Sequence, residues 1–208
     1  MKEYFDLCSK VNSKREEKGL EPLKPIFGCE VYVAANKKEG RDKDKDRPRY
    51  HLILLAKNEQ GYHNLIKIVS RAWVDGFYNK ARTDHDDLKT YHEGIICCSA
   101  CIAGDVPRYI LRDNIQAARE TIEWYKSVFG DDYYIELQRH EVKDPNQHAN
   151  RETFADQHRA NKVLIELAHE YGVKLICSND VHFVNEDDAE AHDHLLCLST
   201  GKNLDDPD

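Results

Sequence analysis

The sequence contains no apolar stretch of about 18 residues, the length that a membrane-spanning helix needs. Its first residues, MKEYFDLCSK, lack the basic segment and apolar stretch that mark a secretory signal peptide. The seven cysteines form an odd set that lies mostly in apolar stretches, and no pair of CxxC motifs is present to hold a structural zinc ion. The sequence therefore predicts a cytoplasmic protein with reduced thiols and no membrane segment.

Basic residues are also too few for a broad nucleic-acid-binding surface, because the formal net charge is -8. Metal ions in a single cleft would reverse the local field, so the charge does not exclude nucleic acid there. We find no internal repeat, low-complexity tract or linker. With 208 residues, 40% hydrophobic and 33% charged, the sequence predicts one domain over 1–208.

Helical and strand patterns alternate along the chain. Helical periodicity is found at 3–18, 58–76, 84–92, 114–130, 154–172 and 188–201. Strand patterns are found at 25–34, 50–56, 94–100, 133–140 and 173–180. This alternation predicts the α/β class with a mainly parallel sheet, either open or closed into a barrel. The charged stretch 36–49 is predicted to be a solvated, mobile loop.

Residues able to bind metal gather near the ends of the predicted strands, where parallel α/β folds place their reactive groups. Asp180 and His182 follow the last strand, and Cys101 follows the strand at 94–100. Glu30 and His51 lie within two other strands. In its apolar run a lone Glu30 carboxylate would cost several kcal/mol to bury unless it were paired, protonated or bound to metal.

Each of these residues also has an ordinary explanation. A histidine beside a strand is commonly a packing residue, a single cysteine is commonly a small buried hydrophobe, and Asp180 could cap the following helix. Asp84 and His85 look like a metal pair, but their place before a short helix makes Asp84 a better N-cap. The residues alone therefore leave a hydrolytic metal site and a set of packing residues both open.

Six motifs in a fixed order carry a resemblance to a known family. They are KPIFGCEVYVA, LLAKNEQGYHNL, GFYNKARTD, EGIICCSAC, YYIELQRH and NDVHFVNEDDAEAHDHLLCLSTGK. Together they resemble the PHP (polymerase and histidinol phosphatase) domains of bacterial DNA polymerase III alpha subunits, over nearly the whole chain. The resemblance implies a distorted, seven-stranded β/α barrel with a multinuclear zinc or manganese centre.

The resemblance also assigns roles to single residues. Matching motif by motif, it implies metal ligation by Glu30, His51, Cys101, Asp180 and His182. His140, Lys80 and Arg82 are predicted to line the cleft or contact substrate phosphate, and no residue is assigned as catalytic. Ala81 departs from the family pattern, in which a proline is common.

The largest departure is at the start of the chain, because family members begin with a strand carrying an H-x-H motif and further ligands. We therefore expect an N-terminally truncated PHP fragment that lacks the first strands. It would bind metal weakly or not at all, would be inactive alone, and would be prone to self-association through exposed strand edges.

For the intact parent, the resemblance implies DNA-directed DNA synthesis in replication, with DNA and other replicase subunits as partners. The PHP domain would add 3′–5′ exonuclease proofreading. Two alternatives stay open: a stand-alone PHP-type phosphoesterase, and a purely structural module without catalysis.

Overall fold

The computed structural model describes residues 2–141 and 153–204. By their internal contacts they divide into two compact units, Met1–Cys177 and Ser178–Asp208, each of which is described by itself below. The first unit holds a sheet with its helices. The second holds one helix and the turns that precede it.

Every predicted helix and strand is present. In chain order the elements are α1 (Lys2–Glu16), β1 (Gly28–Ala34), β2 (Arg49–Ala56), α2 (Glu59–Val74), β3 (Arg82–Thr83), α3 (His85–Thr90), β4 (Ile95–Cys98), α4 (Asp105–Leu111), α5 (Ile115–Phe129), η1 (Gly130–Asp132), β5 (Tyr133–Leu137), α6 (Ala155–Tyr171), β6 (Lys174–Cys177), η3 (Glu186–Asp188) and α7 (Ala189–Thr200). The sequence patterns missed the short β3 and α4. Within the described ranges, no helix combines the length and apolarity that crossing a membrane requires.

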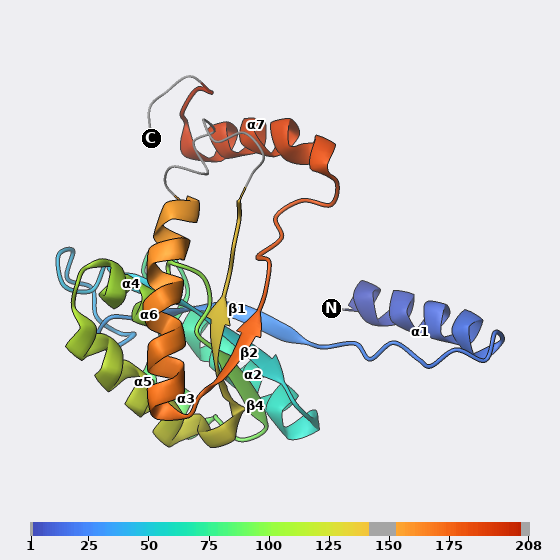
Figure 1. Ribbon diagram of the computed structural model, residues 1–208, viewed down its shortest axis with the longest axis horizontal. Helices are drawn as coiled ribbons and strands as arrows, with labels where there is room; N and C mark the ends of the chain where they lie inside the picture. The colour runs from blue at the N-terminus through green and yellow to red at the C-terminus, as the bar shows by residue number, and fades with distance from the viewer. Residues whose placement is uncertain (1, 142–152, 205–208) are drawn as a thin grey trace. The chain divides into compact units, whose positions relative to one another are not determined.

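The strands form a six-stranded sheet in the order β3-β1-β2-β4-β5-β6 (Figure 1). The β1–β3, β4–β5 and β5–β6 pairs are parallel, whereas β1–β2 and β2–β4 are antiparallel. The sheet is therefore mixed rather than mainly parallel, because β1 and β2 are joined as a hairpin instead of by a helical crossover. The α/β class is confirmed. The described strands form an open sheet, so the barrel stays a prediction.

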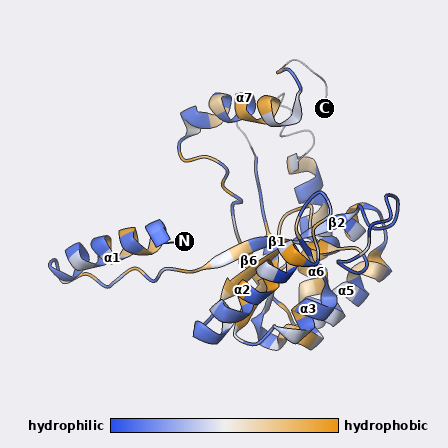
Figure 2. Cartoon of the chain, turned by 180° about the vertical axis from the view of Figure 1, so that it is seen from behind, coloured by the Kyte–Doolittle hydropathy of each residue, from blue (hydrophilic) through white to orange (hydrophobic). Residues whose placement is uncertain are grey.

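One face of the sheet carries the hydrophobic core. Alternate residues of β1 and β2 point into it, as the two-residue period of a strand requires, and α2 packs Leu65 and Ile68 against them. Helices α4, α5 and α6 extend the same core over β4 and β5. In Figure 2 the hydrophobic colours gather in the strands and on the helix sides toward them. The opposite face of β1 and β2 is only partly covered.

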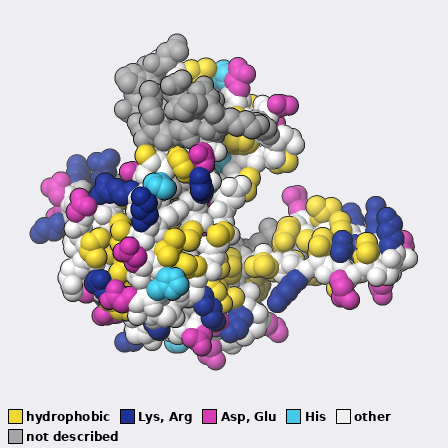
Figure 3. Space-filling model, in the orientation of Figure 1, with side chains coloured by type: hydrophobic (Ala, Val, Ile, Leu, Met, Phe, Trp, Pro, Cys, Tyr) yellow, Lys and Arg dark blue, Asp and Glu magenta, His cyan; other side chains and the backbone are white. Residues whose placement is uncertain are grey.

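Helix α1 buries little of itself, since Cys8 is its one buried residue. Its aromatic side chains Tyr4 and Phe5 reach Phe27, with ring centroids 5.8 and 6.3 Å apart. Hydrophobic side chains lie exposed along α1 and the segment after it (Figure 3). Self-association, which was predicted through exposed strand edges, stays a prediction.

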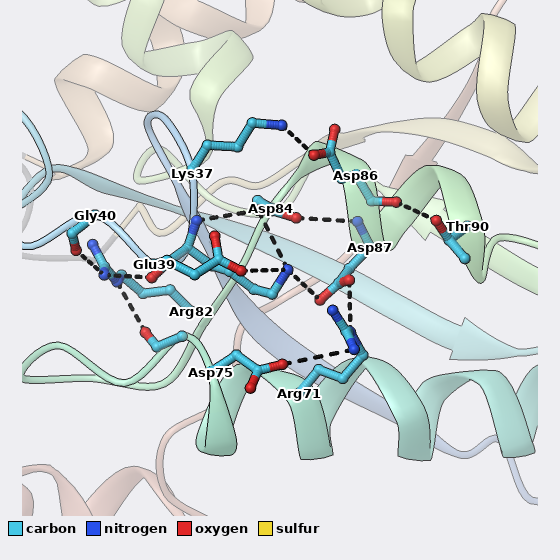
Figure 4. Close-up of polar contacts among 12 residues, drawn as sticks. Lys37, Glu39, Gly40, Arg71, Asp75, Arg82, Asp84, Asp86, Asp87 and Thr90 are labelled. Atoms are coloured by element: carbon cyan, nitrogen blue, oxygen red, sulfur yellow. Dashed lines mark hydrogen bonds and ion pairs between the residues drawn. The ribbon is translucent and has the colours of Figure 1, made fainter.

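The charged loop between β1 and β2 is held in place by a buried lysine, contrary to the expectation of a solvated loop. Lys38 is 3% exposed, and its Nζ lies 3.2 Å from Asp87 Oδ2 and 3.6 Å from Asp84 Oδ2. Burial works against its charge, but hydrogen bonds to Asp87 and Glu39 and the charge of Asp84 outweigh burial and raise the pKa of Lys38. Figure 4 shows this cluster, in which Arg71 also binds Asp87.

Asp84 has the role that its sequence context predicts. It caps α3, because its side chain accepts a hydrogen bond from the Asp87 backbone N–H at 3.1 Å. Its second oxygen accepts the Lys38 backbone N–H at 3.1 Å. Asp84 and Asp87 together thus fix both the start of α3 and the loop after β1.

We expect Lys38→Met to destabilise the fold by about 3–5 kcal/mol, because two buried carboxylates would lose their cation. Urea unfolding followed by circular dichroism measures this change. The matched control is Lys43→Met in the exposed part of the same loop, which should change stability by less than about 0.5 kcal/mol. Equal stabilities of the two variants would contradict a stabilising role for the buried cluster.

Candidate metal centre

The hairpin register brings two predicted ligands to the same face of the sheet. Tyr32 lies opposite His51 and Glu30 opposite Ile53, so Glu30 and His51 are diagonal neighbours. Side chains in this relation are within reach of each other when they are long. The His51 ring also meets the Tyr32 ring edge to face, with centroids 5.1 Å apart.

Glu30 and His51 are in direct contact. Glu30 Oε1 lies 3.0 Å from His51 Nδ1, and the two side chains are 37% and 27% exposed. The apolar run around Glu30 suggested burial, but Glu30 points from the partly covered face while Val31 and Val33 point into the core. The carboxylate is therefore solvated as well as paired, and its burial cost is small.

Cys101 joins these two residues from a tight turn after β4. Its Sγ lies 3.5 Å from His51 Nδ1. Ala100 before it has φ +61°, a left-handed conformation that costs alanine about 1–2 kcal/mol. Gly104 closes the turn, since a Cβ there would lie 2.2 Å from the Ser99 carbonyl oxygen. The turn therefore admits only glycine at 104 without a backbone shift.

The chemical types of these donors, rather than their separations, suit a metal ion. Two ligands at zinc bond lengths of about 2.0–2.3 Å lie about 3.4–3.6 Å apart in tetrahedral coordination. From His51 Nδ1 the Cys101 sulfur lies 3.5 Å away, within that range, whereas the Glu30 oxygen lies 3.0 Å away, at hydrogen-bond distance. Imidazole, carboxylate and thiolate are ligands that zinc accepts, so the donor set fits the group.

Within residues 2–141 and 153–204, no group of three His, Cys, Asp or Glu residues is arranged to hold a metal ion. The three donors of the first unit are linked pairwise through His51 Nδ1. No disulfide joins any of the seven cysteines. Burial raises the pKa of Cys98 to about 12, so this neighbouring thiol stays protonated and packs as a hydrophobe.

Asp180 and His182 belong to the second unit, so their distance from the other predicted ligands is not defined. Asp180 has φ +44°, which aspartate tolerates better than most residues. His182 Nδ1 lies 2.8 Å from the Asp180 carbonyl oxygen, which can only accept a hydrogen bond. A neutral His182 ring therefore carries its lone pair on Nε2, as metal-binding histidines with a carbonyl partner do.

The three predicted cleft residues have different surroundings. His140 is held by α6, where Gln157 Oε1 accepts the His140 backbone N–H at 2.7 Å and Gln157 Nε2 lies 2.9 Å from His140 Nδ1. Lys80 is exposed. Arg82 is 1% exposed and donates to the backbone carbonyls of Gly40, Lys38, Gly76 and Asp46. Through those hydrogen bonds Arg82 holds the loop between β1 and β2 in place. Of Lys80 and Arg82, only Lys80 faces solvent.

Sequence reasoning missed two buried carboxyl groups beside the Cys101 turn. Glu136 on β5 accepts the Ala100 N–H at 2.9 Å. Asp105, the first residue of α4, accepts a hydrogen bond from the Tyr125 hydroxyl at 2.7 Å, and burial raises its pKa to about 6. The signal for Glu136 was the one used for Glu30, a single carboxylate in an apolar strand. Asp105 gave no such signal.

Comparison with known proteins identifies the family. Residues 1–140 match the PHP domain family. The chain belongs to that family.

Two relatives narrow the class further. The chain is 46% identical over 180 residues to the DNA polymerase III subunit alpha of Borreliella burgdorferi, covering 86% of this chain and 15% of that protein. It is 38% identical over 188 residues to the protein of the same name from Thermus aquaticus, covering 89% of this chain and 14% of that protein. The chain therefore matches the PHP region of DNA polymerase III alpha subunits, and it spans about one seventh of their length.

The raised pKa of Asp105 predicts a pH-dependent stability. The folded chain holds this proton up to about pH 6, whereas an unfolded aspartate releases it near pH 4. The contribution of Asp105 to stability is therefore full below about pH 4 and is lost as pH rises through about 6.

Comparison with Asp105→Asn, which cannot titrate, isolates this contribution. The difference in unfolding free energy, wild type minus variant, should fall by up to about 3 kcal/mol from pH 4 to pH 7. Urea unfolding at several pH values measures it. Asp113→Asn, at a side chain 90% exposed, is the control. A difference that does not change with pH would refute the assignment.

Proposed function

We propose that this chain acts as the metal-binding PHP domain of a replicative DNA polymerase III alpha subunit. The main support for this proposal is the cluster of Glu30, His51 and Cys101. In it a carboxylate oxygen and a sulfur both lie within 3.5 Å of one imidazole nitrogen. These residues come from two strands and a turn that are far apart in sequence. Packing alone does not require three metal-capable groups to converge.

Glu30, His51 and Cys101 would hold a divalent ion, zinc or manganese, and Asp180 and His182 are the remaining predicted ligands. When bound, such ions lower the pKa of a coordinated water to about 7 and neutralise phosphodiester charge. The Tyr32 ring against His51 limits the rotation of the imidazole. Exposed Lys80 supplies a cation for substrate phosphate, and Gln157 orients His140.

For the whole protein we propose DNA-directed DNA synthesis in bacterial replication, in the cytoplasm. DNA and other replicase subunits would be its partners. The support is the name that both relatives share and the 86% and 89% of this chain that they match. In that setting the PHP domain would remove mismatched nucleotides from the 3′ end of the new strand.

A second candidate is a structural module without catalysis. It is favoured by the pairing of Glu30 with His51 inside the protein, which satisfies both groups without an ion. The described residues likewise show no ready group of three ligands. A stand-alone phosphoesterase has less support, since both relatives named above are polymerase subunits.

Metal binding separates the candidates. We expect the complete alpha subunit, dialysed against zinc or manganese, to retain metal by elemental analysis, and this chain alone to retain it weakly or not at all. His51→Ala should weaken binding by at least 100-fold, because it removes the atom that both other donors face. Glu30→Gln and Cys101→Ser should each weaken it by about 10–100-fold.

The control for this series is His63→Ala, at an exposed histidine on α2, which should bind metal like the wild type. Asp180→Asn and His182→Ala, measured separately, test the two ligands predicted in the second unit. Equal metal content in wild type and His51→Ala would favour the structural module.

Exonuclease activity requires the complete alpha subunit. With manganese or zinc present, we expect it to shorten a DNA primer with a mismatched 3′ nucleotide, and His51→Ala to abolish this while leaving DNA synthesis intact. Gel analysis of an end-labelled primer measures both reactions. A wild-type subunit that leaves the mismatch untouched would remove proofreading from the proposal but not metal binding.

A further inference from the structure

Where β4 ends, its pairing with β5 is continued by side chains instead of backbone. The last backbone link is the Ser99 N–H, which donates to the Tyr134 carbonyl at 3.0 Å. Ser99 Oγ then accepts the Glu136 N–H at 2.9 Å, and Glu136 Oε2 accepts the Ala100 N–H at 2.9 Å. Two side chains thus take over the hydrogen bonds that a longer β4 would have made.

The Glu136 carboxyl is enclosed. It is 6% exposed, and beside it lies a cavity of about 10 Å³ lined also by Ala100, Cys101 and Gln157. That volume is at the lower limit for a single water molecule. A cavity of this size has no room for a substrate, and the contact of Glu136 with the Ala100 N–H is an internal one.

The bond to Ala100 acts on an unusual residue. Four described non-glycine residues have positive φ: Asn79, Ala100, Asp113 and Asp180. Three of them have a polar side chain that can hydrogen-bond locally, as Asn and Asp do in this conformation, and alanine has none. Because alanine has no polar side chain, the left-handed conformation of Ala100 is stabilised by the hydrogen bond that its N–H donates to Glu136.

The turn from Ser99 to Gly104 is fixed at its other end by the site itself. The His51 backbone N–H donates to the Ala103 carbonyl at 3.1 Å, and the Gly104 N–H donates to the Cys101 carbonyl at 2.8 Å. Cys101 lies between the two anchors, with its Sγ 3.5 Å from His51 Nδ1. One anchor is backbone that most substitutions leave unchanged, and the other is the Glu136 side chain.

We propose that Glu136 is the positioning residue of this centre: by accepting the Ala100 N–H, it holds the Cys101 thiol against the His51 ring. In this role Glu136 acts through the backbone N–H of Ala100, the residue before Cys101. Its effect on thiol position is a property of the metal-free chain. Its effect on metal affinity rests in addition on the proposed function, so the two are measured separately.

The first measurement is NMR of the His51 ring in the chain without metal, with the resonance assigned by His51→Gln. Cys101→Ala defines the shift that follows when the thiol is absent. Glu136→Met keeps the side-chain length but removes the acceptor, and we expect it to move the His51 resonance to the Cys101→Ala position. Glu136→Gln keeps an acceptor oxygen and should leave the resonance at its wild-type position.

Gln157→Ala is the matched control, because Gln157 is 2% exposed and lines the same cavity but bonds to His140 instead of Ala100. It should leave the His51 resonance unchanged, which separates positioning from general loosening of this region. A wild-type resonance in folded Glu136→Met overturns the proposal. So does a shift in Gln157→Ala as large as that in Glu136→Met.

Glu136→Met could fail to fold, which loss of amide dispersion would reveal. Ser99→Ala then serves in its place, because it removes the Oγ that accepts the Glu136 N–H and so loosens the same clamp. We expect it to move the His51 resonance part of the way to the Cys101→Ala position. An unmoved resonance in Ser99→Ala would then overturn the proposal.

The second measurement is the zinc affinity of the complete alpha subunit, by calorimetry. We expect Glu136→Met to bind zinc 10–100-fold more weakly than wild type, the loss typical for residues that orient ligands, and Glu136→Gln to stay within about threefold. If wild type holds no zinc while the NMR shifts appear as expected, the proposed metal function fails and the positioning role stands. If zinc binds but Glu136→Met changes neither its affinity nor the His51 resonance, the positioning role fails alone.

Discussion

The antiparallel register of β1 and β2, in which Tyr32 lies opposite His51, is the constraint on which the chemistry of this chain depends. Because side chains alternate between faces, a slip of one residue in one strand would move its whole set to the other face. The core set, including Leu52 and Leu54, is fully buried under α2. Burial of those leucines therefore fixes His51 on the open face beside Glu30.

Cys101 reaches the same place by a different route. The parallel pair β4–β5 brings the end of β4 beside β5, and the turn after it folds back onto the start of β2 through the contact of Gly104 with His51. Thus one strand pair supplies the imidazole and the carboxylate, and another supplies the thiol. The site is a product of sheet topology, and the packed helices on the other face keep that topology rigid.

The helices and most strands could be predicted because periodicity is a local property of the sequence. The short β3 and α4 were missed, since two residues show no period and Pro107 interrupts the pattern of α4. The buried state of Lys38 could not be predicted either, because its partners lie 46 and 49 residues further on and the surrounding loop has the composition of a solvated one.

The residues of the candidate site likewise differ in how far the sequence predicted them. Glu30, His51 and Cys101 were found from residue type and motif, and the structure brings them together. Glu30 and Glu136 look alike in the sequence, each a carboxylate in an apolar strand. Only tertiary structure decides that Glu136 is the enclosed one, because that depends on which face the helices cover. The second-unit ligands Asp180 and His182 rest on motif alone.

The buried Lys38 cluster also has a consequence for the order in which the chain folds. A hairpin forms from local contacts, whereas Lys38 loses its water only after α3 has docked with Asp84 and Asp87, far along the sequence. Forming these ion pairs closes stretches of 46 and 49 residues, which costs more chain entropy than a local contact does. If the pairs form after the rate-limiting step, they slow unfolding and leave the folding rate unchanged.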